Sequence, residues 1–119
     1  MPPVIGNLQN LNELDCSTCR LTALPPEIGE LRALGKLLLP ENQFVALPAE
    51  IGNLSVLIEL DLNKNQLTAL PKELGQLTTL QILRLDGNPL KIPPPEVVAQ
   101  GTQAVLEFLR NMPGDPPLQ

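Results

Sequence analysis

Residues 57–67 read Leu-Ile-Glu-Leu-Asp-Leu-Asn-Lys-Asn-Gln-Leu and follow the pattern L-x-x-L-x-L-x-x-N-x-L. Across residues 59–63, apolar side chains alternate with polar ones, which is the period of a strand with one buried and one solvated face. We therefore expect a short strand here, with its leucines directed into a core and its polar residues directed outward.

The whole chain repeats this pattern with a fixed step, because Leu14, Leu37, Leu60 and Leu83 lie 23 residues apart. The pairs Leu24-Pro25, Leu47-Pro48 and Leu70-Pro71 keep the same step, as do Ile28-Gly29, Ile51-Gly52 and Leu74-Gly75. Residues 2–8 match the second half of a unit, so the chain opens in mid-repeat. We expect one repeat domain at 1–112, made of a partial repeat (2–10), repeats at 11–33, 34–56, 57–79 and 80–101, and a capping helix (102–112), followed by a disordered tail (113–119).

These motifs resemble the leucine-rich repeat family, specifically its 23-residue L-P-x-E-I-G class found in Ras-group and Roco-type proteins. The resemblance implies an α/β fold: a right-handed solenoid, or horseshoe, with a parallel sheet on its concave face and short helical or 3₁₀ turns on its convex face. It also implies that Asn42, Asn65 and Asn88 form a ladder of hydrogen bonds between coils. An amide suits that place because it offers two donors and an acceptor to a turn. Cys19 takes the same position in the first unit.

The convex turns have their own local signals. Pro25, Pro48 and Pro71 suit the first position of a helical turn, because proline lacks the N–H that would be unpaired there. The glutamate that follows two residues later suits the positive end of the turn, and the next glycine permits close packing.

The fourth unit departs from the pattern at Ile92-Pro-Pro-Pro, and a different element is expected to follow. We predict a helix from Gln103 to about Asn111, with Thr102 as its N-cap and Pro113-Gly114 as its stop. Val105, Phe108, Leu109 and Met112 then share one face, which would cover the apolar edge of the last coil. No phosphate-binding G-x-x-x-x-G-K-[ST] motif follows, so a GTPase activity has no support.

Composition narrows the class of protein further. The 119 residues are 43% hydrophobic, almost entirely aliphatic, and carry a formal net charge of −5. This charge disfavours general binding to nucleic acid or to anionic membranes, and it favours a neutral or basic polypeptide partner. The first residues lack the charged and apolar regions of a leader, and no apolar run is long enough to span a bilayer. With only two cysteines, we expect a cytoplasmic protein.

Two clusters could suggest chemistry, and both have a structural explanation. Cys16 occupies a core leucine position and Cys19 the asparagine position, so we predict free, buried thiols and treat a thiol redox protein as a minor alternative. Glu13, Asp15, Glu59 and Asp61 share the outer face of the sheet, but the two pairs belong to units one and three. Lys36 and Leu38 lie between the pairs, so we expect a solvated, partly charge-paired surface rather than acid–base catalysis. We expect no enzyme activity, no cofactor and no metal.

The outer face of the sheet is the expected binding site. Its side chains form mixed-charge columns, and Leu38 and Ile82 are apolar where other units carry Asp or Glu. We expect a protein or peptide partner there, on a monomer or a weakly self-associating chain. The alternative is a structural role, as a segment of a longer array or as a scaffold that self-associates through Ile5, Leu8 and Leu11. The expected partner-binding residues are Glu13, Asp15, Lys36, Leu38, Pro40, Glu59, Asp61, Asn63, Ile82, Arg84 and Asp86.

Overall fold

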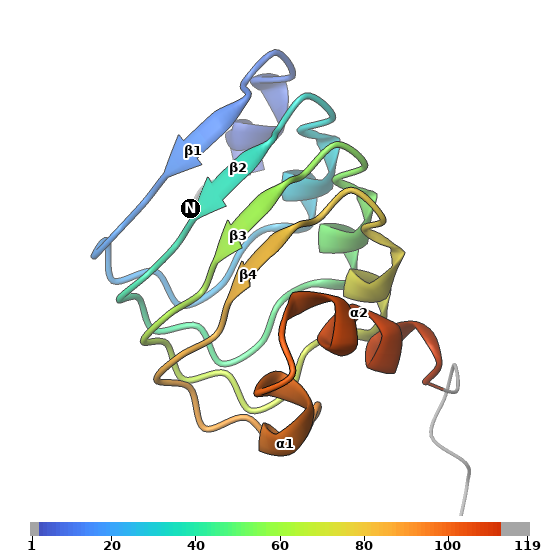
Figure 1. Ribbon diagram of the computed structural model, residues 1–119. Helices are drawn as coiled ribbons and strands as arrows, with labels where there is room; N and C mark the ends of the chain where they lie inside the picture. Colours follow the sequence, from blue (N-terminus) through green and yellow to red (C-terminus); the bar gives the residue numbers. More distant parts are fainter. Residues whose placement is uncertain (1–2, 113–119) are drawn as a thin grey trace, which may run out of the picture.

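A computed structural model describes residues 3–112 as a stack of similar coils (Figure 1). Each coil contributes one short strand, and the four strands form a parallel sheet in the order β1-β2-β3-β4. A 3₁₀ helix precedes each strand and lies on the opposite side of the stack, and two α-helices follow the last strand. The strands are β1 (Glu13–Asp15), β2 (Lys36–Leu38), β3 (Glu59–Asp61) and β4 (Ile82–Arg84). The 3₁₀ helices are η1 (Pro3–Asn7), η2 (Pro26–Glu30), η3 (Ala49–Asn53) and η4 (Lys72–Gln76), and the α-helices are α1 (Pro95–Val98) and α2 (Thr102–Arg110). The predicted leucine-rich repeat solenoid is confirmed.

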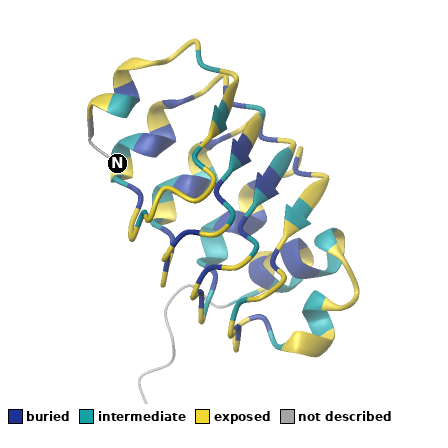
Figure 2. Ribbon diagram, turned by 90° about the vertical axis from the view of Figure 1, so that its left-hand side faces the viewer, coloured by how far each residue is buried: buried dark blue, intermediate teal, exposed yellow. Residues whose placement is uncertain are grey.

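The core lies between the sheet and the 3₁₀ helices, and it is built from the leucines that the 23-residue step places in register. Leu14 pairs with Leu37, Leu37 with Leu60, and Leu60 with Leu83. In the two inner coils, the side chains of Leu37 and Leu60 are completely buried. Figure 2 shows the inner residues as buried and most outer residues as exposed or half-buried. Stacked aliphatic side chains therefore supply most of the hydrophobic stabilisation.

The 3₁₀ helices begin one residue later than predicted. Pro25, Pro48 and Pro71 are the N-cap residues, in extended conformation, rather than the first helical residues. The reason is that the carbonyl of Pro25 already accepts the first hydrogen bond of the turn, from the N–H of Ile28, at 3.0 Å. The acidic residue predicted for the first turn is present in η2, η3 and η4.

The glycine in each convex turn permits neighbouring turns to pack closely, as predicted. A Cβ atom on Gly52 would lie 2.6 Å from the carbonyl oxygen of Glu73, and one on Gly75 would lie 2.6 Å from the backbone nitrogen of Arg110. Side chains at these positions would force the turns, or η4 and α2, apart.

The ladder of asparagine side chains is also confirmed. The side-chain NH₂ of Asn65 donates to the carbonyls of Leu39 and Leu62, at 3.0 Å each, and its oxygen accepts from the N–H of Phe44. Asn42 and Asn88 make equivalent bonds to their own and the preceding coil. Each amide thus fastens two adjacent coils.

The first coil differs from the prediction of buried thiols. Both cysteines are free, but Cys16 is only half-buried and Cys19 is exposed. Among the described residues, β1 is the end strand, so Cys16 has a neighbouring coil on one side only. The prediction of burial treated the first coil as equivalent to the inner coils, where Leu39 and Leu62 are enclosed from both sides.

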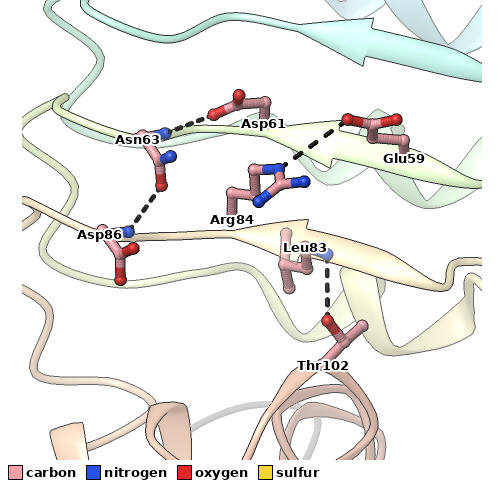
Figure 3. A network of polar contacts seen from close by, with 7 residues as sticks. All are labelled: Glu59, Asp61, Asn63, Leu83, Arg84, Asp86 and Thr102. Atoms are coloured by element: carbon pink, nitrogen blue, oxygen red, sulfur yellow. Dashed lines mark hydrogen bonds and ion pairs between the residues drawn. The ribbon is translucent and has the colours of Figure 1, made fainter.

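At the other end, α2 packs against η4 and takes the place of a further convex turn (Figure 1). Two details of the prediction are wrong. Gly101, not Thr102, is the N-cap, because the Thr102 hydroxyl instead accepts the N–H of Leu83 at 3.0 Å (Figure 3). The buried face consists of Val105, Leu106 and Leu109, whereas Phe108 and Met112 are half-buried.

The segment that joins β4 to α2 includes a cis peptide bond between Ile92 and Pro93 and the short helix α1. The predicted helix stop at Pro113-Gly114 and the predicted tail at 113–119 lie outside the described residues.

Candidate binding face

Parallel pairing places the predicted side chains together on the concave face of the sheet. Glu13, Lys36, Glu59 and Ile82 form one row across the strands, and Asp15, Leu38, Asp61 and Arg84 form the next. Beyond the strand ends, the N–H of Glu41 donates to the carbonyl of Asn63 and that of Lys64 to the carbonyl of Asp86. The third row, Ser17, Pro40, Asn63 and Asp86, therefore continues the same face.

The apolar positions lie among charged ones. Leu38 is half-buried in β2, in register with Asp15 on one side and Asp61 on the other. Ile82 is 37% exposed in β4 and pairs with Glu59. A partner that contacts this face would therefore meet two aliphatic side chains, Leu38 and Ile82, surrounded by acidic and basic side chains.

Ile58, which directly precedes β3, was missed by the sequence analysis. Its side chain is 47% exposed, more than that of Ile82. The signal was available, because the equivalent positions in other units hold Asn12, Gly35 and Gln81. An isoleucine among polar residues and glycine is the same kind of departure that marked Leu38.

Polar contacts hold several of the side chains on this face (Figure 3). The Arg84 guanidinium lies 3.9 Å from the Glu59 carboxylate, and both are solvent-accessible, so this ion pair contributes little to folding stability. Asp61 accepts the backbone N–H of Asn63 at 3.0 Å, and the Asn63 side-chain oxygen accepts that of Asp86 at 2.8 Å. These bonds give Asn63 a fixed orientation between two strands.

Asp15 is fixed in a similar way. Its carboxylate accepts both the hydroxyl and the backbone N–H of Ser17, and these two hydrogen bonds lower its pKa from the ordinary value. The side chain thus remains ionised at neutral pH, and the acidic end of its row keeps its charge.

Two observations bear on metal binding and on thiol chemistry in this part of the molecule. Among residues 3–112, no group of three or more His, Cys, Asp or Glu side chains is arranged to hold a metal ion. Burial, and then the neighbouring Cys19, raise the pKa of the Cys16 thiol, whereas a nucleophilic cysteine requires a lowered pKa. The structure therefore offers no argument for a thiol redox role.

A second concave feature lies away from the sheet. A groove of about 510 Å³ lies between α1 and α2, and it is lined by Val97, Gln100, Ala104, Glu107, Phe108, Asn111 and Met112.

Among the described residues, none of the helices has the length and apolar character that a bilayer crossing requires.

Comparisons with known proteins define the class of this protein. The family model for the leucine-rich repeat region matches residues 1–114, so the chain belongs to the leucine-rich repeat family. Proteins of this family are generally non-catalytic modules for protein–protein interaction. No curated protein sequence matches the chain significantly.

Solved structures show the same fold. The leucine-rich repeat protein LIC12759 of Leptospira interrogans is 39% identical, with a TM-score of 0.64, over 77% of this chain and 30% of its own. The ectodomain of the Arabidopsis thaliana receptor kinase GASSHO1/SCHENGEN3, in complex with CASPARIAN STRIP INTEGRITY FACTOR 2, is 40% identical, with a TM-score of 0.70, over 76% of this chain and 11% of its own. The leucine-rich repeat ectodomain of the Arabidopsis receptor kinase HAESA, in complex with an N-terminally extended IDA peptide hormone ligand, is 30% identical, with a TM-score of 0.62, over 76% of this chain and 16% of its own. The chain thus spans less than a third of the length of each.

Proposed function

We propose that this chain is a non-catalytic interaction module that binds a polypeptide through the concave face of its sheet. The observation that carries the proposal is the position of Leu38, an apolar side chain at the centre of a regular, charged and solvent-accessible surface. A parallel sheet is normally covered on both faces, and here one face is free of any covering element among residues 3–112. Two of the similar structures are complexes with peptide or protein ligands, which supports the same use of this fold.

The chemistry of the face specifies the kind of partner. The five acidic side chains of the face outnumber its two bases, Lys36 and Arg84, and the chain as a whole carries a net charge of −5. The acidic residues are Glu13, Asp15, Glu59, Asp61 and Asp86. A segment with an aliphatic side chain for contact with Leu38 and basic residues on either side would be complementary in both shape and charge.

We further place the chain in the 23-residue Ras-group and Roco-type class and in the cytoplasm. The fixed step and the L-P-x-E-I-G motif support the class. The cysteine content supports the compartment, since two cysteines are too few for the disulfide framework of a secreted protein.

The proposal is tested by comparing which proteins are captured from the source cell by wild type, by Leu38→Glu and by Gln76→Glu. Gln76 is exposed at the end of η4, on the convex side, so its substitution adds the same charge at a distance from the sheet. A partner retained by wild type and Gln76→Glu but lost by Leu38→Glu supports the concave face. A partner lost only by Gln76→Glu would place the site on the convex side.

A further inference from the structure

The segments that lead from each 3₁₀ helix into the next strand run along one edge of the stack, the upper edge in Figure 1. In the third and fourth coils, residues 51–58 and 74–83 contain no charged side chain. Val56 is nevertheless 44% exposed and Ile58 47% exposed. Each coil concerned has another coil or α2 on both sides, so this exposure does not arise at an end of the stack. We call this edge the rim, and it comprises residues 32–35, 55–58 and 78–81.

The rim of the inner coils presents a strip of apolar groups. Leu57 is completely buried between Val56 and Ile58, so both neighbours lie on the outside. One coil further on, the exposed Thr79 donates its hydroxyl to the carbonyl of Leu57 at 2.8 Å. That hydroxyl is satisfied within the fold, and the methyl group is the part left for a partner. Ala33 holds the equivalent exposed position in the second coil.

One charged group adjoins this strip. Arg32 is exposed directly before Ala33, and its Nε donates to the carbonyl of Gly29 at 3.0 Å, which holds the guanidinium at the rim. Within residues 3–112, the only ion pair joins Glu59 and Arg84, so no described carboxylate neutralises Arg32. An aliphatic strip that ends at an unpaired guanidinium is complementary to an aliphatic surface that ends in a carboxylate.

The spacing of the coils matches that of an α-helix. Hydrogen-bonded strands lie about 4.8 Å apart, and one turn of an α-helix rises about 5.4 Å. The rim keeps the strand spacing, because the N–H of Ile58 donates to the carbonyl of Gly35 and the N–H of Gln81 donates to the carbonyl of Ile58. A helix that lies along the stack would therefore present one residue of the same face to each successive coil, at positions i, i+4 and i+7.

We propose that the rim binds a short amphipathic helix of another protein, with an acidic residue at position i and aliphatic residues at i+4 and i+7. The carboxylate pairs with Arg32, the first aliphatic side chain covers Val56 and Ile58, and the second covers the methyl group of Thr79. In this orientation the acidic residue stands in the first turn of the helix, where a negative charge is stabilising.

The rim is separate from the concave binding face of the proposed function. It uses none of the partner-binding residues predicted for that face, and its single charge is basic, whereas the concave face is predominantly acidic. The rim therefore selects an acidic helix and the concave face a basic segment, and either can hold without the other.

A second copy of the chain does not supply this helix from residues 3–112. Each 3₁₀ helix there has five residues and α1 has four. Helix α2 has nine, but its Leu106 and Leu109 are already completely buried. The occupant is therefore a helix of a different protein.

The probe is the peptide acetyl-Ser-Ala-Glu-Gln-Ala-Gln-Leu-X-Gln-Leu-Ala-X-Ala-amide, in which a hydrocarbon staple joins the two X residues on the far face and holds the helix. It is titrated into the isotope-labelled full chain and followed by NMR. We expect shift changes at Arg32, Val56, Ile58 and Thr79. A peptide with Gln in place of Glu should bind about twofold to fivefold more weakly, as expected for an exposed ion pair. A peptide with Gln in place of both Leu should cause no shift change.

Four variants of the chain, each checked for an unchanged melting temperature, complete the test. Ile58→Ser should weaken binding at least about fivefold, because it removes aliphatic contact area. Val45→Ser is its matched control, since Val45 is 53% exposed in the segment that leads from β2 to η3. Arg32→Glu should reverse the preference between the glutamate and glutamine peptides, and Leu38→Glu on the concave face should leave binding unchanged.

Three results would overturn the proposal. The first is an absence of shift changes at the rim with the glutamate peptide. The second is equal binding of that peptide by wild type and Ile58→Ser, or equal weakening by Ile58→Ser and Val45→Ser. The third is self-association of the chain that shifts the same rim residues. Loss of binding in Leu38→Glu would place the peptide on the concave face instead.

Discussion

Each asparagine of the ladder satisfies backbone groups that belong to two coils at once. Asn65 is only 6% exposed, and its amide reaches Leu39 and Phe44 in the preceding coil and Leu62 in its own. Removing the hydrogen-bond partner of a buried backbone group costs more free energy than removing a hydrogen bond of the same length at the surface. The reason is that water cannot replace the buried bond.

Asn65→Ala should therefore lower the free energy of unfolding by about 1–3 kcal/mol, since it leaves these groups without partners. Gln66→Ala, at the exposed neighbouring position, should change it far less. Chemical denaturation of both variants measures the difference. Equal destabilisation would mean that the ladder does not fasten the coils.

A left-handed backbone position recurs in each of the four coils, directly before the asparagine position, which Cys19 occupies in the first coil. Thr18, Glu41, Lys64 and Gly87 have φ values of 55°, 58°, 58° and 78°. The sequence could not predict this feature, because the four residues share no chemistry, and Thr18 adopts the conformation although no asparagine follows it.

Gly87→Ala should lower the free energy of unfolding by about 1–2 kcal/mol, because an L side chain is strained in this conformation. The added Cβ would also lie 3.3 Å from the Cα of Lys64. Asp86→Ala, at the exposed position before it, is the control and should have little effect. A thermal melt in which Gly87→Ala matches wild type would contradict the strain argument.

The two thiols should react at different rates. Cys19 is exposed, whereas Cys16 is half-buried and has a raised pKa, so less of it is thiolate near neutral pH. We expect a maleimide to label Cys19 first, and the labelling rate of Cys16 to keep rising as the pH passes 9, the ordinary value for the thiol. Mass spectrometry of a labelling time course distinguishes the two sites. Simultaneous labelling at all pH values would refute the assigned environments.

Among the elements, α2 determines whether the last coil is covered. Three side chains along it contact the solenoid backbone: Thr102 accepts from Leu83, Gln103 donates to Leu80, and Arg110 donates to Gly75. The buried Leu106 and Leu109 pack into the core between these polar contacts.

Leu106→Ala should cost about 2–5 kcal/mol, as expected for a completely buried leucine. Glu107→Ala, at the next and exposed position, should be close to neutral. The paired denaturation curves test whether α2 belongs to the same cooperative unit as the repeats. If Leu106→Ala leaves the main transition unchanged and melts α2 alone, then α2 is an appendage rather than a cap.

The sequence predicted the repeated elements well because each signal occurs several times at one spacing. The strands and the buried leucines follow from a single period applied to every coil, whereas the asparagine contacts were implied by the resemblance to the leucine-rich repeat family. Predictions failed where the environment is not repeated. Cys19 is exposed because the first coil has one neighbouring coil within residues 3–112, and Leu106 was missed because helical spacing alone left more than one face possible for α2. Thr102 stands where the sequence suggests an N-cap residue, but its hydroxyl instead accepts the N–H of Leu83 on β4.

For the candidate site, the sequence indicated which side chains share a face, and the sheet register agrees with it. What it could not indicate was exposure, which depends on neighbouring coils. Leu38 is partly shielded between Asp15 and Asp61, whereas Ile58 was not considered and is 47% exposed. Whether these side chains bind a partner remains a prediction.

In the molecule as a whole, the two sides of strand β2 face opposite environments. Leu37 and Leu39 point into the core and are completely buried, whereas Leu38 points to the concave face. Leu38→Glu would add a third carboxylate between Asp15 and Asp61, at a cost of about 0.2–1 kcal/mol for each like-charged pair. The variant should therefore still fold, and a melting curve confirms that before binding is measured.

The central measurement is the dissociation constant of a captured partner, determined by calorimetry for wild type, Leu38→Glu and Gln76→Glu. We expect Leu38→Glu to weaken binding by at least about 2 kcal/mol, or about thirtyfold, because it places a charge at the centre of the contact. Gln76→Glu, which adds the same charge on the convex side, should bind as wild type does. If Leu38→Glu binds with wild-type affinity while Gln76→Glu does not, the concave face is not the binding site.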